Sequence, residues 1–382
     1  MNVWKECKLG DVASYVNRGV SPLYVDQDGV LVINQKCIRN GRIDLGPSRL
    51  SSKTKKFAFE KNLQLGDILI NSTGVGTAGR VAFFNNSVQA TVDSHVTIVR
   101  VNKADPKYVF YVLFGMEPDI ETFAEGSTGQ IELGRERIKD ILISLPPLPE
   151  QRSIAAVLSS LDDKIDLLHR QNKTLESLAE TLWRKAFEED PHPEWEERGL
   201  DEIADFLNGL PCQKYPPLVG GITLPVIKIK ELRNGFTDDS DLVTDQISKE
   251  YIIEDGDIVF SWSGSLEVVV WAFGKGALNQ HLFKVTSQKF PKWFYFYWIR
   301  HHLSDFQDIA QDKATTMGHI QRHHLSDANV VIPDKETFET LDVNMTPIFN
   351  KILNNLKERR KLGILRDTLL PKMMAGEVKI PA

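Results

Sequence analysis

The most regular pattern in the chain is an alternating spacing of four and three residues between apolar positions in the stretch 161–186. This spacing forms the a/d seam of a coiled coil, so it predicts a long helix that pairs with another helix. One seam position is an asparagine, which usually fixes the register of a coiled coil at some cost in stability. The seam residues are Leu161, Ile165, Leu168, Asn172, Leu175, Ala179, Leu182 and Ala186.

Short apolar runs elsewhere have the length and composition of β-strands. "GDILI" (66–70) and "GDIVF" (256–260) are entered through a Gly-Asp turn, and "VAFF" and "HVTIVRV" have the same character. The aromatic segments after Pro106 and Pro291 have helical length, but their pattern alone does not separate helix from strand. The globular parts are therefore predicted to be mixed α/β.

These elements occur twice in the same order. "WKECKLGDVASYVNRG" at residue 4 is answered by "WEERGLDEIADFLNG" at residue 195, and "KCIRNGRID" by "KELRNGFTD". The strand runs and the aromatic segments follow in both copies, while the offset drifts as loops gain or lose residues. A period this long indicates duplicated domains and not a solenoid. The predicted boundaries are 1–145 and 191–332 for the two domains, and 146–190 and 333–382 for the helical segments that follow them.

The C-terminal segment repeats the first helical segment at a constant offset of 187, which aligns Ile352, Leu362 and Leu369 with seam residues. Residues 161–190 carry a net charge of −3 and residues 350–372 a net charge of +5. Opposite charges beside a seam favour pairing between the two helices, the alternative being two unrelated amphipathic surface helices. Thirty helical residues span about 45 Å, or roughly 13 base pairs. Two related domains held by such a spacer fit a bipartite DNA reader.

The composition indicates the cellular compartment of the protein, and the charge distribution shows one strongly basic stretch. The 382 residues include 42% hydrophobic and 26% charged positions, with three widely spaced cysteines, no leader pattern and no apolar run of membrane-spanning length. We expect a soluble, cytoplasmic protein. The net charge of −6 argues mildly against nucleic acid, but residues 36–56 carry seven basic residues and one acidic residue. A solvated surface loop is the alternative interpretation of that stretch.

The sequence resembles a known family, the specificity subunits of type I restriction-modification systems. The resemblance covers essentially the whole chain and rests on "PLPEQRSIAAVLSSLDDKID", "LLPKMMAGEVKI", "LGDILINSTG" and "STGQIELGRERIKDILISLPPLP". It implies two α/β (mixed α+β) target-recognition domains, separated by two long helices that form an antiparallel coiled coil, in a pseudo-twofold layout. Each domain would read one half of a split, asymmetric DNA target, and the coiled coil would act as a ruler.

The resemblance also implies partners. The helical segments would dock two methyltransferase subunits, and through them a restriction subunit, so S-adenosylmethionine, ATP and Mg would be bound by partners and no cofactor by this chain. The second junction, "VIPDKETFETLDVNM", lacks the "PEQR" of the first, so the two docking surfaces are expected to differ. The residues expected to dock partners or form the coiled coil are Gln151, Arg152, Leu161, Ile165, Leu168, Leu175, Leu182, Ile352, Leu362 and Leu369.

No motif assembles a catalytic site. "GVGTAG" (74–79) is followed by a strand-like run where a dinucleotide fingerprint needs a helix, so a loop that brings backbone N–H groups to a phosphate fits better. "LPPL" and "YPPL" lack the Asn or Asp of an amino-methyltransferase motif, and no phosphate loop is present. A metal site at the "GHIQRHHL" histidines is the weaker interpretation, because no acidic residue or cysteine accompanies them. His95 and His281 match between copies, and we interpret them as hydrogen-bonded structural residues.

The sequence therefore predicts a DNA-recognition subunit without its own active site and without a bound metal. Two rival hypotheses remain: a self-contained nuclease or methyltransferase, and a coiled-coil scaffold that does not bind DNA. A methylation-only system is a further alternative within the same family. Basic and amide side chains read bases or hold phosphates, and the expected DNA contacts are Lys36, Arg39, Arg42, Lys53, Lys55, Lys56, Asn71, Thr73, Gln130, Lys228, Lys230, Arg233, Ser261, Ser263, His319, Gln321 and Arg322.

Overall fold

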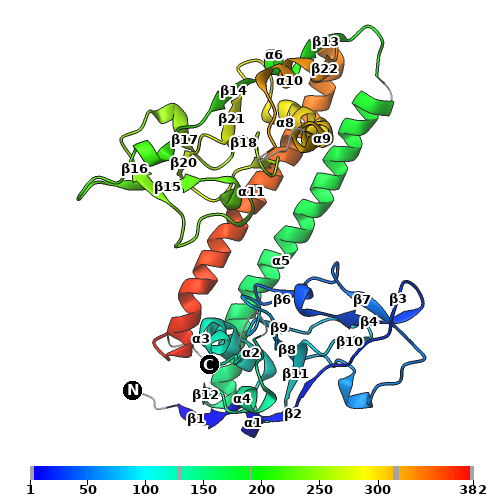
Figure 1. The fold of residues 1–382 in the computed structure, drawn as a ribbon, viewed down its shortest axis with the longest axis vertical. Helices are drawn as coiled ribbons and strands as arrows, with labels where there is room; N and C mark the ends of the chain where they lie inside the picture. Colours follow the sequence, from blue (N-terminus) through cyan, green and yellow to red (C-terminus); the bar gives the residue numbers. More distant parts are fainter. Residues whose placement is uncertain (1–3, 127–130, 190, 313–317, 379–382) are drawn as a thin grey trace. The chain divides into compact units, whose positions relative to one another are not determined.

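The chain folds into two compact units, and both long helices contribute to each of them. The computed structural model describes residues 4–126, 131–189, 191–312 and 318–378. The first unit comprises Met1–Asp163 with Ile364–Ala382, and the second comprises Lys164–Gly363. Helices α5 (Leu148–Arg184) and α11 (Lys335–Met374) are thus divided between the units (Figure 1). The predicted boundaries treat the helices as separate segments, whereas in the structure each globular part packs with two helix segments.

The first globular part is built on two four-stranded sheets. One has the order β2-β11-β8-β9 and is antiparallel throughout. The other has the order β10-β4-β7-β3, with β10 and β4 parallel. Two further pairs are β1 with β12 and β5 with β6. The strands are β1 (Lys5–Lys8), β2 (Ala13–Arg18), β3 (Tyr24–Val25), β4 (Gly29–Ile33), β5 (Ile38–Arg39), β6 (Arg42–Ile43), β7 (Arg49–Ser52), β8 (Ile68–Asn71), β9 (Val81–Phe83), β10 (Ala90–Val92), β11 (Val96–Val101) and β12 (Leu142–Leu145).

The aromatic segment after Pro106 is helix α2 (Pro106–Gly115), which settles the alternative that the pattern left open. The Asp105 side chain caps it by accepting a hydrogen bond from the Tyr108 N–H at 3.0 Å, and proline at the first position suits a helix start. The six residues from Tyr108 to Leu113 are all buried, so α2 is surrounded by apolar neighbours on nearly every side. The remaining short helices are α1 (Leu9–Val12), α3 (Glu117–Thr122) and α4 (Arg135–Lys139).

The second globular part repeats this design. Its antiparallel sheet β14-β21-β18-β19 corresponds strand for strand to β2-β11-β8-β9, and its sheet β16-β15-β20-β17 again contains one parallel pair. Its strands are β13 (Glu196–Gly199), β14 (Asp205–Asn208), β15 (Thr223–Ile227), β16 (Leu242–Thr244), β17 (Ile252–Ile253), β18 (Ile258–Ser261), β19 (Val268–Val270), β20 (Gly276–Leu278), β21 (Leu282–Thr286) and β22 (Asn329–Ile332). Its helices are α6 (Leu200–Ile203), α7 (Ile229–Asn234), α8 (Lys292–His301), α9 (Leu303–Asp312) and α10 (Arg322–Asp327).

This correspondence confirms the duplicated mixed α/β domains predicted from the repeat. The pair β13 and β22 matches β1 and β12, and α8 matches α2. The copies differ mainly in their connections: α7 is a full helix where the first copy has a 3-10 turn (Gln35–Cys37), and α9 is longer than α3. The loops have therefore diverged around a common framework.

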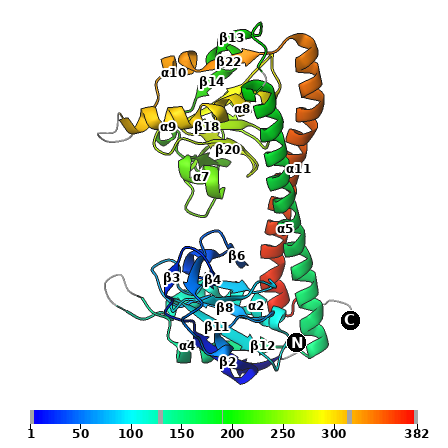
Figure 2. The same cartoon turned by 90° about the vertical axis from the view of Figure 1, so that its right-hand side faces the viewer.

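The two long helices pair within each unit, as the seam predicted, and they run antiparallel, as the family resemblance implied (Figure 2). In the first unit, Arg366 of α11 forms an ion pair with Asp162 of α5 at 2.8 Å. In the second unit, Asn172 of α5 hydrogen-bonds both to the carbonyl of Ile352 at 3.1 Å and to the Asn355 side chain at 2.8 Å. Every predicted seam residue of α5 is buried or half-buried.

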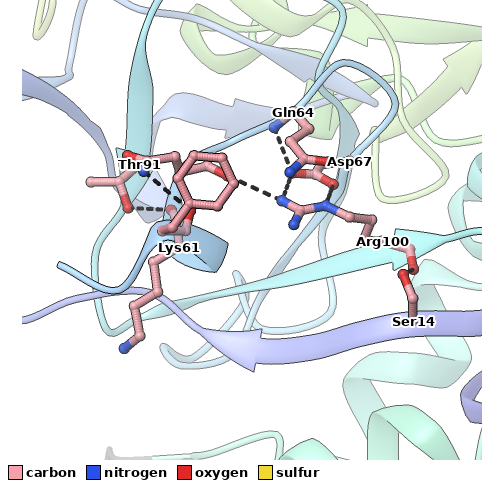
Figure 3. A network of polar contacts seen from close by, with 8 residues as sticks. Ser14, Lys61, Gln64, Asp67, Thr91 and Arg100 are labelled. Atoms are coloured by element: carbon pink, nitrogen blue, oxygen red, sulfur yellow. Dashed lines mark hydrogen bonds and ion pairs between the residues drawn. The ribbon is translucent and has the colours of Figure 1, made fainter.

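A buried ion pair supports the central sheet at the start of β8. Arg100 of β11 donates through Nε and Nη2 to the two carboxylate oxygens of Asp67, both at 2.7 Å (Figure 3). The second copy has an equivalent pair, since Lys284 lies 3.0 Å from Asp257. Both cations also donate to a backbone carbonyl at the same place in the fold, Asn62 in one copy and Ile252 in the other. The interaction is thus retained although the cation sits at a different position of the strand.

Candidate DNA-recognition surface

The central sheet of each copy ends in a loop that carries several predicted site residues. In the first copy, β8 ends at Asn71, and the loop 72–80 leads into β9. The glycines of "GVGTAG" in this loop have φ of 101°, 69° and 86°, a conformation that other residues rarely adopt. A strand follows the loop, as predicted, so the segment lacks the helix that a dinucleotide fingerprint requires.

A hydrogen-bonded hydroxyl and imidazole stand at the start of this loop. Thr73 Oγ1 lies 2.8 Å from His95 Nδ1 and also donates to Gln35 Oε1 at 3.1 Å. The backbone of His95 is held by the side chain of Asp93, whose Oδ1 accepts its N–H at 2.9 Å. Burial raises the pKa of Asp93, and the hydrogen bond from the His95 N–H opposes this shift. The His95 side chain itself is exposed.

The second copy has the same arrangement with different residue types. Ser263 Oγ lies 3.1 Å from His281 Nδ1, and Asn279 Oδ1 accepts the His281 N–H at 3.3 Å. The interpretation of His95 and His281 as hydrogen-bonded residues is confirmed. We refer to Thr73 with His95, and to Ser263 with His281, as the hydroxyl–imidazole pairs.

Two matched arginines adjoin these pairs, and the sequence pattern singled out only one of them. Arg135 is the first residue of the short helix α4, and Arg322 is the first residue of the corresponding helix α10. Arg135 donates to Asn17 Oδ1 at 2.6 Å, and Arg322 donates to the carbonyl of Phe206 at 3.3 Å. The offset of 187 between the arginines equals the offset of the two helical segments, a signal that could have identified Arg135.

Each hydroxyl residue also lies in a β-bridge to the segment before the short helix. Thr73 bridges to Glu132 and Ser263 bridges to His319. Glu132 forms an ion pair with Arg18 at 2.8 Å, whereas the His319 ring lies 6.2 Å from the ring of Trp262. The predicted contact His319 is therefore beside its hydroxyl–imidazole pair, but the copies have different chemistry at this position.

Both copies have a hollow next to this arrangement, and the hollow of the first copy is the more polar of the two. The hollow of the first copy has a volume of about 310 Å³ and that of the second about 390 Å³. The hollow of the first copy is lined by Asn17, Arg18, Gly19, Lys61, Glu132 and Arg135. Its three cations, Arg18, Lys61 and Arg135, were not predicted from the sequence. The second is lined by Arg233, Gly264, Ser265, Leu266, Gln307, Ala310, Gln311 and Gly318. Cations around a concave surface suit phosphate oxygens.

The predicted cations of the first copy do not form one cluster. Lys36 and Arg39 are exposed, and Lys36 follows Gln35, which bonds to Thr73. Lys55 and Lys56 are also exposed, whereas Lys53 lies 3.6 Å from Asp28. Arg42 is half-buried and donates to the carbonyl of Asp162 in α5 at 3.2 Å. Arg42 therefore secures a helix in this structure, and its role as a DNA contact stays a prediction.

The predicted cations of the second copy are held by acidic groups. Lys228 bonds to Asp241 and lowers the pKa of that carboxyl group through this hydrogen bond. Lys230 lies 3.4 Å from Glu231, and Arg233 forms an ion pair with Glu267. The Lys228–Asp241 pair is exposed on both sides, and such pairs contribute little energy, so Lys228 can exchange its carboxylate for a phosphate. The carboxylates paired with Lys230 and Arg233 are only 1% and 21% exposed.

Three further predicted residues require a correction or lie outside the described chain. Asn71 and Ser261 have no exposed surface, so neither reaches a base edge in this conformation. Asn71 instead donates to the carbonyl of Gln35, and Ser261 to the carbonyl of Ser265. Both shape the loop because buried polar groups need partners. Gln130 lies outside the described residues, while Gln321 is exposed at the start of α10.

Residues 1–177 and 193–365 match the family model described as a type I restriction modification DNA specificity domain. The chain belongs to this family. The two matched ranges each contain one globular part and most of a long helix, and together they cover most of the chain. The family expected from the sequence motifs is thereby confirmed.

Curated relatives and a solved structure agree with this assignment. The chain is 25% identical over 365 residues to the type I restriction enzyme MjaIX specificity subunit of Methanocaldococcus jannaschii, covering 88% of this chain and 83% of the relative. It is 21% identical to the HindI specificity subunit of Haemophilus influenzae, covering 99% of this chain and 100% of the relative. A type I restriction-modification S subunit from M. genitalium has the same fold, with a TM-score of 0.64, 15% identity, and coverage of 97% and 96%.

The junction between the first specificity domain and α5 differs from expectation. Gln151 was expected to dock a partner, but it is 4% exposed, accepts the Asp105 N–H at 2.9 Å and donates to the Pro146 carbonyl at 2.8 Å. It therefore joins the start of α5 to the start of α2, which corrects the prediction. Phe338 occupies the equivalent position of α11 and packs against Trp293 and Phe294. Arg152 is exposed.

The remaining helix residues behave as a seam. Leu168, Ile165 and Ile352 are buried, and the other predicted positions are half-buried, namely Leu161, Leu175, Leu182, Leu362 and Leu369. Leu369 packs against the apolar core of the first unit, and Leu182 against that of the second. Among the described residues, no group of three or more His, Cys, Asp or Glu side chains is arranged to hold a metal ion.

Proposed function

We propose that the chain is the DNA-recognition subunit of a type I restriction-modification complex and binds a bipartite, asymmetric target in double-stranded DNA. The observation that carries this proposal is the tandem match of two DNA specificity domains, each with the same sheet and the same hydroxyl–imidazole pair. Two related but non-identical domains are suited to two different half-sites. The exposed basic residues of the first copy and the polar hollows would hold phosphates.

The proposal assigns no catalysis to this chain. Its sequence contains no phosphate loop, no amino-methyltransferase motif and no arrangement of nucleophile, base and orienting group. The chemistry would come from partner subunits, which would bind S-adenosylmethionine for methylation and ATP with Mg for restriction. The relatives' names describe specificity subunits, which agrees with a recognition role.

The helices are proposed to space the two domains and to dock two methyltransferase subunits. The antiparallel pairing found within each unit supports a continuous spacer. Exposed positions such as Arg152 would face a partner.

We place the protein in the cytoplasm, where the DNA target and the partner subunits of such a complex would be found. In the part of the chain that the structure describes, no helix combines the length and the apolar character needed to cross a membrane.

Mapping of N6-methyladenine across the genome tests the proposal. Cells that contain the complete system are compared with cells that lack only this chain. The proposal predicts a split methylated motif that disappears without the chain. An unchanged methylation pattern would leave the scaffold hypothesis, and methyl transfer by the purified chain with S-adenosylmethionine would show that it is an enzyme. A motif without accompanying DNA cleavage would identify a methylation-only system.

A further inference from the structure

The two hydroxyl–imidazole pairs are the most specific chemistry that the diverged copies share. Their outer partners differ, since the first copy has Thr73 and Asp93 where the second has Ser263 and Asn279. The imidazole is the component that both retain, and in both it follows the same turn before a central strand, β11 or β21.

The need to hold the backbone of this turn in place does not explain why both copies have an imidazole ring there. The backbone at His95 is fixed by two bonds that need no imidazole, one from its N–H to Asp93 and one from the Ser72 N–H to its carbonyl at 2.8 Å. The second copy has both bonds at His281 as well. The ring adds only a side-chain hydrogen bond at a site that is exposed in the first copy, and such a bond contributes little stability.

The hydrogen bonds define which ring nitrogen carries the proton. Thr73 donates its hydroxyl hydrogen to Gln35, so its oxygen accepts the Nδ1–H of His95. In the second copy, Gln280 Nε2 lies 3.4 Å from His281 Nε2. This long contact fits an acceptor at Nε2 with the ring proton on Nδ1, toward Ser263, and a base amine would take the place of Gln280. In its neutral form each ring therefore offers Nε2 as the acceptor.

A hydrogen-bond acceptor held in a fixed position can recognise an amino group, which is a hydrogen-bond donor. In the major groove, the exocyclic amines of adenine and cytosine are the donors that bases present. The neighbouring arginines, Arg135 and Arg322, can hold the backbone so that a base edge meets the ring. We propose that His95 and His281 are specificity-determining residues, each accepting a hydrogen bond from the exocyclic amine of one base in its half-site. Thr73 and Ser263 are positioning residues that act through the ring.

The test uses cells with the complete complex and maps the methylated motif for His95→Ala and His281→Ala separately. Each variant should relax one base position in one half-site, with discrimination at that position lowered about 5- to 150-fold, and leave the other half-site unchanged. Thr73→Val should relax the same position as His95→Ala, and Thr73→Ser, which restores the hydroxyl group, should recover it. His192→Ala removes an exposed histidine that lies just before the second range matched by the family model (193–365), and it should change nothing.

The inference rests on the proposed function, but the two fail differently. If the wild-type complex produces no motif that depends on the chain, the proposed function is wrong. If the motif exists but is unchanged in both histidine variants, or is unchanged while methylation falls uniformly, the rings do not read bases and this inference is overturned. Co-purification of the partner subunits with each variant establishes folding, and His95→Asn is the second variant if His95→Ala does not assemble.

Discussion

The side chains of Asn172 and Asn355 hydrogen-bond to each other at 2.8 Å inside the seam between α5 and α11. Both are almost fully buried, with 2% and 0% of their surface exposed. The sequence showed a single polar seam residue in α5, and the structure adds its partner on α11. The two buried amides can hydrogen-bond to each other only when the helices are in this register, so the pair favours one alignment over its neighbours.

This pair leads to a prediction about stability. Asn172→Leu should lower the free energy of unfolding by about 1–3 kcal/mol, because it leaves the Asn355 amide buried without its partner. The double variant Asn172→Leu with Asn355→Leu should recover that loss, since two apolar seam residues replace two polar ones. Urea denaturation of the wild type, both single variants (Asn172→Leu and Asn355→Leu) and the double variant measures the coupling. Additive losses in the double variant would show that the two asparagines act independently.

A second prediction concerns a cavity of about 580 Å³ in the first unit, between α2, β12 and the end of α11. Leu370 and Met374 line it, whereas the equivalent residues in the second unit are the buried Trp183 of α5 and the buried Phe187 of the π-helical turn Lys185–Glu189 that follows α5. Leu370→Trp should fill the cavity and raise stability by about 1 kcal/mol. Leu370→Ala is the control and should lower stability by about 2–5 kcal/mol. A loss of stability in Leu370→Trp would mean that the cavity does not accommodate an indole.

The buried carboxylate of Asp93 predicts a dependence on pH. Burial raises its pKa in the folded state, so the folded state binds a proton more readily than the unfolded chain, and stability falls as the pH rises through that pKa. Asp93→Asn keeps the acceptor for the His95 N–H, as Asn279 does in the second copy. The variant should therefore melt at a higher temperature than the wild type at pH 7.

This advantage should shrink as the pH falls toward about 4, the ordinary pKa of an aspartate, and should vanish below it, where the wild-type carboxyl becomes neutral in both states. Thermal melting across this range checks the prediction. A difference that does not change with pH would show that charge is not its cause.

The basic stretch of the first copy predicts a salt effect. Lys36 and Arg39 are exposed and, within the described residues, form no ion pair. If both bind phosphates, Lys36→Ala with Arg39→Ala should reduce the slope of log K against log salt concentration by about 0.9 for each phosphate that is no longer neutralised. Arg42→Ala should instead lower thermal stability, because Arg42 donates to a carbonyl of α5. DNA binding by the assembled complex at several salt concentrations measures the slope, and equal slopes in wild type and double variant would rule out phosphate binding by these residues.

The repeat, the strands and the coiled-coil seam could all be predicted from the sequence, because each depends on a short periodic pattern that burial imposes locally. The candidate surface was harder to predict. Asn71 and Gln151 have the residue types of contacts, but the fold uses their amides to satisfy buried groups. Arg135 was missed because its role depends on its position at the start of α4, beside β2. Residue type indicates which chemistry is possible, and tertiary structure decides which side chains remain available.

The central claim is that each copy reads one half of a split target, and an exchange of copies tests it most directly. In this chimera, residues 5–145 are replaced by a second copy of residues 196–332, so that α5 and α11 each follow the same specificity domain. The measurement is the genome-wide N6-methyladenine motif of cells with the complete complex, after co-purification has shown that the chimera assembles with its partners. The account predicts that one half-site disappears and the motif contains the other half-site twice. An assembled, active chimera that still methylates the original asymmetric motif would contradict it.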